Sequence, residues 1–257
     1  MPEYYAHTGS DPEDVSTWQT LSDHANEVAR RAEAFAEKFD MGTWGRTLGL
    51  LHDAGKASVG FRQRLEGGKP VDHSTAGAKI AIERYATCGQ FMAYALCGHH
   101  GGMANGMNWS ECFGSQRVSL RTPLKDRLAN TIDPYDAFFD LAEAGEISLP
   151  DLAQLGAPMR YGRTFEGTAS KVFSTFVLEH FLYSALVDSD YLDTERFMTP
   201  EAAEAREARD LASMEELLAK LEAHMSELMG SAKETPVNRV RRSVYEECLG
   251  ASVQPCG

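Results

Sequence analysis

The stretch Leu48-Gly49-Leu50-Leu51-His52-Asp53-Ala54-Gly55-Lys56 is an apolar helical run that ends on two adjacent polar residues. Because His52 ends the apolar run, its side chain is expected to point inward, and Asp53 follows it directly. A buried imidazole or carboxylate is costly unless it is paired or bound to a metal ion. This stretch therefore indicates a helical protein in which polar groups converge at helix ends.

The rest of the chain has helical periodicity and few strand signals. Residues 101–122 are rich in glycine and lack periodicity, so they are expected to form a long loop. Loops of this length inside a compact domain are commonly functional or disordered. The sequence thus predicts an all-α domain of about eight to ten helices. The expected helices span residues 21–39, 43–55, 75–87, 90–98, 123–130, 134–144, 165–195, 199–229 and 235–250.

The composition is that of an ordinary globular protein. The chain has 257 residues, of which 43% are hydrophobic and 25% charged, with a net charge of −13. This charge argues against nucleic-acid binding through a uniformly basic surface. Five cysteines without a Cys-x-x-Cys pair argue against a disulfide framework or a zinc ribbon. Without an apolar run of membrane-spanning length or a visible signal peptide, we expect a cytoplasmic protein that does not enter a membrane.

Histidines are concentrated in the first part of the chain, and most fall at inward or helix-terminal positions. His24 lies on the apolar stripe of its helix, and His99 and His100 end an apolar helix just before a glycine pair. A single inward histidine is more often a satisfied core residue than a ligand. Several of them together with an adjacent aspartate favour a metal centre. The six histidines are His7, His24, His52, His73, His99 and His100.

These residues resemble the motifs of a known family. His24, then His52-Asp53, then an aspartate near 190 resemble the HD phosphohydrolase superfamily. More specifically, they resemble the HD nuclease of type I CRISPR systems, and its type I-C branch most of all. The resemblance covers about residues 4–195. The matching segments, in family order, are Tyr5-Ala6-His7-Thr8, Leu51 to Lys56, Asp72 to Ala78 and Gly98 to Gly102.

The resemblance implies an HD-domain helical bundle and a division of the chain. Residues 1–198 would form the HD nuclease domain, and residues 199–257 would form C-terminal helices and a linker. Residues 238–257 resemble the stretch that leads into the helicase of a fused nuclease-helicase. No phosphate-binding G-x-x-x-x-G-K-[ST] loop is found in the chain. We therefore expect a nuclease portion that belongs with a helicase.

The resemblance also implies two metal positions that share Asp53. The first would be held by His24, His52, Asp53 and a late aspartate, and the second by Asp53, His73, His99 and His100. Asp190 is favoured over Asp188 as the late ligand, because the two lie about 200° apart on a helix and Asp190 aligns with the family's aspartate. Asp53 and Lys56 would be catalytic, with Lys56 contacting the scissile phosphate. His7 and Asp188 could each contact a metal ligand and hold it in its orientation.

The implied activity is cleavage of single-stranded DNA in CRISPR interference, an antiviral defence. The strand would arrive from the helicase after an RNA-guided surveillance complex of the Cascade type opens the duplex. Imidazole-rich sites favour two ions of Mn²⁺, Fe²⁺, Co²⁺ or Ni²⁺ over Mg²⁺. Four basic residues could line a DNA path, or could simply face solvent. They are Arg117, Arg121, Lys125 and Arg127.

Two other functions remain open from the sequence. The chain could be an HD-type nucleotide or cyclic-nucleotide phosphohydrolase, which would need a pocket closed around a base and phosphates. It could instead be a helical interaction module with a vestigial site, which docks a helicase onto an RNA-guided complex. The presence of every motif ligand argues against the second alternative.

Overall fold

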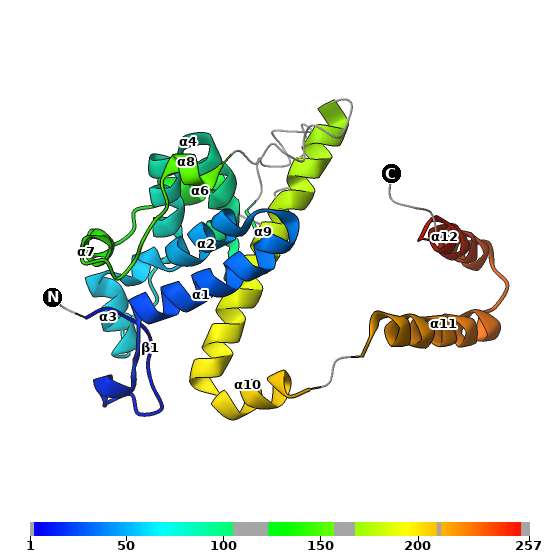
Figure 1. The fold of residues 1–257 in the computed structure, drawn as a ribbon, viewed down its shortest axis with the longest axis horizontal. Coiled ribbons are helices and arrows are strands. Elements are labelled where there is room, and N and C mark those ends of the chain that lie inside the picture. The colour runs from blue at the N-terminus through cyan, green and yellow to red at the C-terminus, as the bar shows by residue number, and fades with distance from the viewer. Residues whose placement is uncertain (1–2, 105–122, 157–167, 210–211, 253–257) are drawn as a thin grey trace. The chain divides into compact units, whose positions relative to one another are not determined.

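The computed structural model describes residues 3–104, 123–156, 168–209 and 212–252. Within these ranges the chain is all-α, as predicted, apart from the two-stranded antiparallel sheet of β1 (Tyr5–His7) and β2 (Gln19–Thr20) (Figure 1). The eleven α-helices of the described ranges are α1 (Leu21–Ala36), α2 (Gly42–Leu51), α3 (Val59–Leu65), α4 (Ser74–Gly98), α6 (Leu124–Ala129), α7 (Ala137–Glu143), α8 (Leu152–Leu155), α9 (Thr168–Met198), α10 (Pro200–Glu207), α11 (Met214–Ser231) and α12 (Pro236–Ser252).

The chain divides into two compact units, Met1–Ala205 and Arg206–Gly257. The first unit carries the hydrophobic core and extends into α10, where Ala203 is buried. The boundary expected from the sequence followed residue 198. In the second unit, α11 has no buried residue, and most of its large apolar side chains are exposed.

Helices α1 and α2 pack with their backbones nearly in contact. A Cβ atom added at Gly49 would lie 2.4 Å from the Cα of Ala29, and one at Gly45 would lie 2.3 Å from the carbonyl oxygen of Ala32. Neither distance leaves room for a side chain, so glycine is required at both positions. This close packing brings the C-terminal end of α2, and with it His52, directly beside α1.

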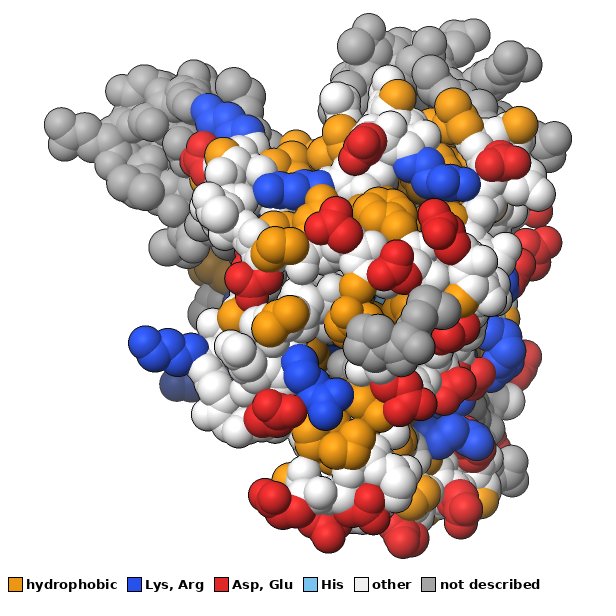
Figure 2. All heavy atoms as spheres, turned by 90° about the vertical axis from the view of Figure 1, so that its left-hand side faces the viewer, with side chains coloured by type: hydrophobic (Ala, Val, Ile, Leu, Met, Phe, Trp, Pro, Cys, Tyr) orange, Lys and Arg blue, Asp and Glu red, His pale blue; other side chains and the backbone are white. Residues whose placement is uncertain are grey.

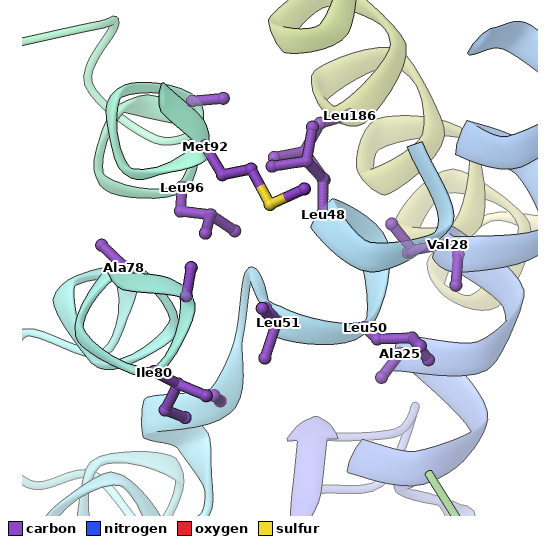
Figure 3. Packing of buried hydrophobic residues seen from close by; sticks show 14 of the residues in the cluster. Ala25, Val28, Leu48, Leu50, Leu51, Ala78, Ile80, Met92, Leu96 and Leu186 are labelled. Atoms are coloured by element: carbon purple, nitrogen blue, oxygen red, sulfur yellow. The ribbon is translucent and has the colours of Figure 1, made fainter. Parts of the chain in front are cut away.

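Helix α4 folds back on itself at Ala86, which has a φ of 49° and a ψ of −119°. A straight helix of this length would span about 37 Å. Instead, the two halves lie side by side (Figure 3). His73 precedes the first half and His99 follows the second, so the bend brings the two histidines to the same end of the bundle.

The core of the first unit lies between α1, α2, α4 and α9. Leu48, Met92 and Leu186, from three of these helices, point toward one another, and all three are buried (Figure 3). Trp44 packs beside them and donates a hydrogen bond from its indole nitrogen to the carbonyl oxygen of Leu155, 2.8 Å away. The short α8 is thereby fastened to the bundle.

The single helix expected over residues 199–229 is wrong, because α10 ends at Glu207 and α11 begins at Met214. Ser213 caps α11 and forms a reciprocal capping box with Glu216, which is a strong signal for a helix start. The loop expected over 101–122 lies outside the described residues from position 105 onward.

No helix in the described part of the chain is both long and apolar enough to cross a membrane.

The contact between α1 and α2 makes a testable prediction. Gly49→Ala should lower the free energy of unfolding by about 2–3 kcal/mol, because the added methyl group forces the two backbones apart. Urea unfolding followed by circular dichroism would measure this loss. Gly230→Ala is the matched control, since nothing lies within 4 Å of a Cβ added there and alanine favours the helix. Equal stabilities for the two variants would contradict this account of the packing.

Candidate metal centre

Five segments, one of them α9, bring the site residues to one place inside the first unit. His24 lies on the buried face of α1, and His52 and Asp53 follow the last residue of α2. His73 directly precedes α4, and His99 directly follows it. His24, His52 and Asp53 are at most 1% exposed, which is rare for such polar side chains.

The carboxylate of Asp53 lies between two groups of histidines. Its Oδ2 is 3.3 Å from Nε2 of His24 and 3.2 Å from Nε2 of His52. Its Oδ1 is 3.5 Å from Nε2 of His73 and 3.6 Å from Nε2 of His99. Each oxygen therefore faces a different pair of imidazoles, which is the arrangement of a bridging ligand.

The late aspartate that enters this site is Asp190. Its Oδ1 is 3.3 Å from Nε2 of His24 and 3.7 Å from Nε2 of His52. Asp188 is exposed on another face of α9, so its position does not fit the orienting role considered for it. The separation of about 200° between residues two apart on a helix explains why only one of them faces the bundle.

His100 completes the second group of histidines, although it is more exposed than His99. Its Nε2 lies 2.8 Å from Nε2 of His73. The rings of His99 and His100 lie side by side, with centroids 4.0 Å apart. Adjacent residues can face one point here because α4 ends at Gly98 and the chain turns.

Backbone contacts orient the imidazoles so that Nε2 faces the centre. A carbonyl oxygen can only accept a hydrogen bond, so a ring nitrogen that contacts one must carry the proton. In the neutral tautomer this leaves a lone pair on Nε2, which is the form that binds a metal ion. The Nδ1 atoms donate in this way from His52 to Gly49 at 2.7 Å, from His99 to Leu96 at 2.8 Å and from His73 to Val71 at 3.3 Å.

His24 is oriented by a carboxylate that the sequence reading missed. Its Nδ1 donates to Oδ2 of Asp193 at 2.7 Å, and Gln19 donates to the same oxygen at 2.8 Å. Asp193 is 4% exposed and lies one helical turn after Asp190. The signal was available, because residues three apart share one face of a helix.

The first group of histidines lies in a strongly negative environment. Burial lowers the pKa of His24, but hydrogen bonds with three carboxylates outweigh burial and raise it to about 9. Burial likewise lowers the pKa of His52, and the charge of Asp53 helps raise it to about 10. Burial alone would raise the pKa of Asp53, yet Lys56 and His52 hold it well below its ordinary value. This part of the site therefore favours positive charge, either as bound protons or as a cation.

In the second group, His73 and His100 favour the neutral imidazole. Burial lowers the pKa of His100 to about 4 and also lowers the pKa of His73, each against the opposing charge of Asp53. These rings are therefore unprotonated at neutral pH. Neutral imidazoles are the ligand form, so no proton has to leave His73 or His100 before it can bind a metal.

These residues fit divalent transition-metal ions. Two sets of ligand atoms, His24, His52 and Asp53, and Asp53, His73, His99 and His100, each lie within 4.8 Å of one another. Among the described residues, Oδ1 of Asp53 and Nε2 of His99 are buried without a hydrogen-bond partner. Such orphaned atoms are costly unless a ligand satisfies them. The site can therefore hold a metal ion, and its imidazole and carboxylate donors suit a transition metal.

Lys56 and His7 lie beside Asp53 and His24 respectively. The ammonium of Lys56 is 2.6 Å from Oδ2 of Asp53 and donates to the carbonyl oxygen of Ala6 at 3.2 Å. The ring of His7 is stacked edge-on to that of His24, with centroids 4.8 Å apart. Both residues also line a cleft of about 430 Å³ that reaches His73 and His100. The centre is thus accessible from one side.

Gly55 is required for the second group to approach Asp53. A Cβ atom added at Gly55 would lie 2.4 Å from the carbonyl oxygen of His73. Because that atom belongs to the backbone, it cannot move aside as a side-chain tip could. The short turn after Asp53 and the segment before α4 therefore touch directly.

A comparison with protein-family models finds no match for this chain, and a comparison with curated proteins finds none at the threshold applied.

The role of Asp193 can be tested by removing its charge. Asp193→Asn should weaken binding at the position of His24 and His52 by about tenfold or more, because the hydrogen bond that orients His24 loses its anionic acceptor. Competition with a chromogenic chelator for Mn²⁺ or Ni²⁺ would measure the affinity. Asp188→Asn is the control on the same helix, and it should bind as the unmodified protein does. Unchanged affinity in Asp193→Asn would remove this carboxylate from the centre.

Proposed function

We propose that the protein is a metal-dependent nuclease that hydrolyses phosphodiester bonds of single-stranded DNA. The observation that most supports this proposal is the position of Asp53, whose two oxygens face two separate pairs of histidine nitrogens. A carboxylate that two ions share would hold them close enough to stabilise both the attacking and the leaving oxygen of a phosphodiester. The resemblance to the HD nuclease of type I CRISPR systems supplies the substrate.

The chain's own residues would position and polarise the substrate. Two bound divalent ions would supply Lewis-acid charge to the attacking and leaving oxygens of the phosphodiester. Lys56, which lines the cleft, would place its ammonium next to a non-bridging phosphate oxygen and stabilise the charge that develops there. His7, whose ring is stacked edge-on against that of His24, would limit water access on that side of the imidazole. Burial lowers the pKa of His7 to about 3, so its ring stays neutral.

The cleft offers contacts for the nucleotides that flank the scissile bond. Lys56 and His73 line the cleft, and Phe61 and Val71 add apolar surface against which a base could pack. The exposed Arg64 also lines the cleft and could contact a neighbouring phosphate. An open cleft that combines cationic and apolar groups is suited to a flexible single strand.

The surface charge is consistent with a strand that is delivered by a partner. On the face drawn in Figure 2, Lys and Arg side chains are scattered among Asp and Glu side chains and form no single basic patch. With a net charge of −13, the chain has little general attraction for DNA. We therefore propose that a helicase and an RNA-guided surveillance complex of the Cascade type bring the strand to this site.

The size of the cleft supports a second candidate function. A volume of about 430 Å³ lies within the range of small-molecule pockets. A nucleotide or cyclic nucleotide phosphohydrolase would use the same bridging carboxylate. The two functions differ in whether a long strand can pass through the site.

Circular single-stranded DNA separates the two functions, since it has no ends to enter a closed pocket. With Mn²⁺ or Ni²⁺ added to metal-free protein, we expect the circle to be cut and a panel of nucleotides and cyclic dinucleotides to stay intact. Hydrolysis of a nucleotide with an uncut circle would overturn the nuclease and favour the phosphohydrolase. A folded protein that binds no metal and cuts neither would support a non-catalytic interaction module.

Substitutions at Asp53 and Lys56 should affect different properties. Asp53→Asn should abolish cleavage and weaken metal binding, because it removes the negative charge that both groups of histidines share. Lys56→Met should slow cleavage about 100-fold and retain the metal, since it removes a cation rather than a ligand. Metal analysis and single-turnover cleavage would measure both effects. Lys38→Met is the control, because Lys38 is exposed. Loss of metal from Lys56→Met would reassign Lys56 to the architecture of the site.

A further inference from the structure

The C-terminal end of α4 carries His99 and His100 and depends on a side chain from another helix. The amides of Gly101 and Gly102 both donate to the carbonyl oxygen of Gly98, at 3.0 and 2.6 Å. The carbonyl oxygen of Cys97 instead accepts from Nη1 of Arg127, at 2.5 Å. The last carbonyls of a helix need such partners, and a cation is favoured at this end of the helix.

The same guanidinium also reaches the N-terminal end of α4. Nη2 of Arg127 donates to the hydroxyl of Ser74 at 2.8 Å and lies 3.9 Å from Oδ1 of Asp72. Asp72 in turn caps the helix, since it accepts from the amide of Thr75 at 3.1 Å and from its hydroxyl at 2.7 Å. One side chain therefore contacts both residues that flank His73 and the turn that leads to His99.

We propose that Arg127 is a positioning residue that clamps the two ends of α4 together and thereby forms the second metal position. This inference rests on the metal centre of the proposed function. It concerns only the group of His73, His99 and His100, because among the described residues no hydrogen bond or ion pair joins Arg127 to α1 or to the end of α2.

The clamp is needed because α4 is bent. The two halves are joined by the turn at Ala86, whose positive φ is unfavourable for an alanine. The ends that carry the ligands lie far from this turn along the helix. Nε2 of His73 and Nε2 of His100 nevertheless lie 2.8 Å apart, within hydrogen-bond distance, so the two ends must be held close together. The contacts of Arg127 at the open end of the hairpin hold the two ends together in addition to this histidine pair.

The chemistry of arginine fits this role better than that of lysine. A guanidinium presents donors in a rigid planar fork and can satisfy two acceptors in different directions, whereas an ammonium on a flexible chain is a point charge. Arg127 is also 24% exposed, with its donors turned inward. Of the four basic residues considered for a DNA path, Arg127 thus uses its guanidinium for hydrogen bonds within the fold. Arg117 and Arg121 lie outside the described residues.

Titration of the full chain with Mn²⁺, followed by electron paramagnetic resonance of the free ion, tests the proposal. The unmodified protein should bind two ions. Arg127→Met should keep the ion of His24 and His52 at unchanged affinity and bind the second ion 10–100-fold more weakly. Arg127→Lys should lie between the two, because it keeps the charge but cannot fork. Arg46→Met is the control, since Arg46 forms a half-exposed ion pair with Glu33 at 3.3 Å, away from the site.

Hydrogen exchange of the metal-free variants gives a second readout that needs neither metal nor activity. In Arg127→Met, amides of residues 97–102 should exchange faster, whereas those of α1 should not change. Two ions bound at unmodified affinity, or equal loss of both ions, would overturn the inference. Two ions bound by an unmodified protein that cleaves no DNA would overturn the proposed function alone and leave the role of Arg127 standing.

Discussion

The buried carboxylate of Asp53 is the group on which the rest of the structure depends. A charge that is 1% exposed is stable only if other groups compensate for its lost hydration, and here Lys56 and several imidazoles do so. Those groups come from α1, from the end of α2 and from both ends of α4, so the helices that build the core also enclose the carboxylate. Both the close packing of α1 against α2 and the bend in α4 are needed to bring these groups around the carboxylate.

The parts of the fold that follow from local pattern were predictable. The apolar periodicity of α1 and the inward position of His24 follow from a 3.6-residue repeat, and the adjacent His52 and Asp53 follow from the end of an apolar run. The break between α10 and α11 was missed, although Ser213 and Glu216 carry a capping signal, because an uninterrupted alanine- and glutamate-rich stretch suggested one helix.

The parts that depend on tertiary contacts could not be read from the sequence. Arg127 looks like a surface cation, and nothing near it in the chain shows that its partners lie at Cys97 and Ser74. Asp193 could have been proposed from its spacing to Asp190, but only the structure shows that it contacts His24. Residues that hold a candidate metal ligand in its orientation are recognised from their contacts in the structure rather than from a sequence motif.

The contact between His24 and Asp193 also bears on how the protein folds. It joins residues 169 positions apart, so it closes a long loop whose entropy must be overcome before the contact contributes stability. Contacts of such long range slow folding relative to the local contacts within each helix. A ribosome releases α1 and α2 long before α9, and the centre stays incomplete until α9 has docked. The complete set of candidate ligands could therefore bind a metal ion only after α9 has emerged and packed against the rest of the unit.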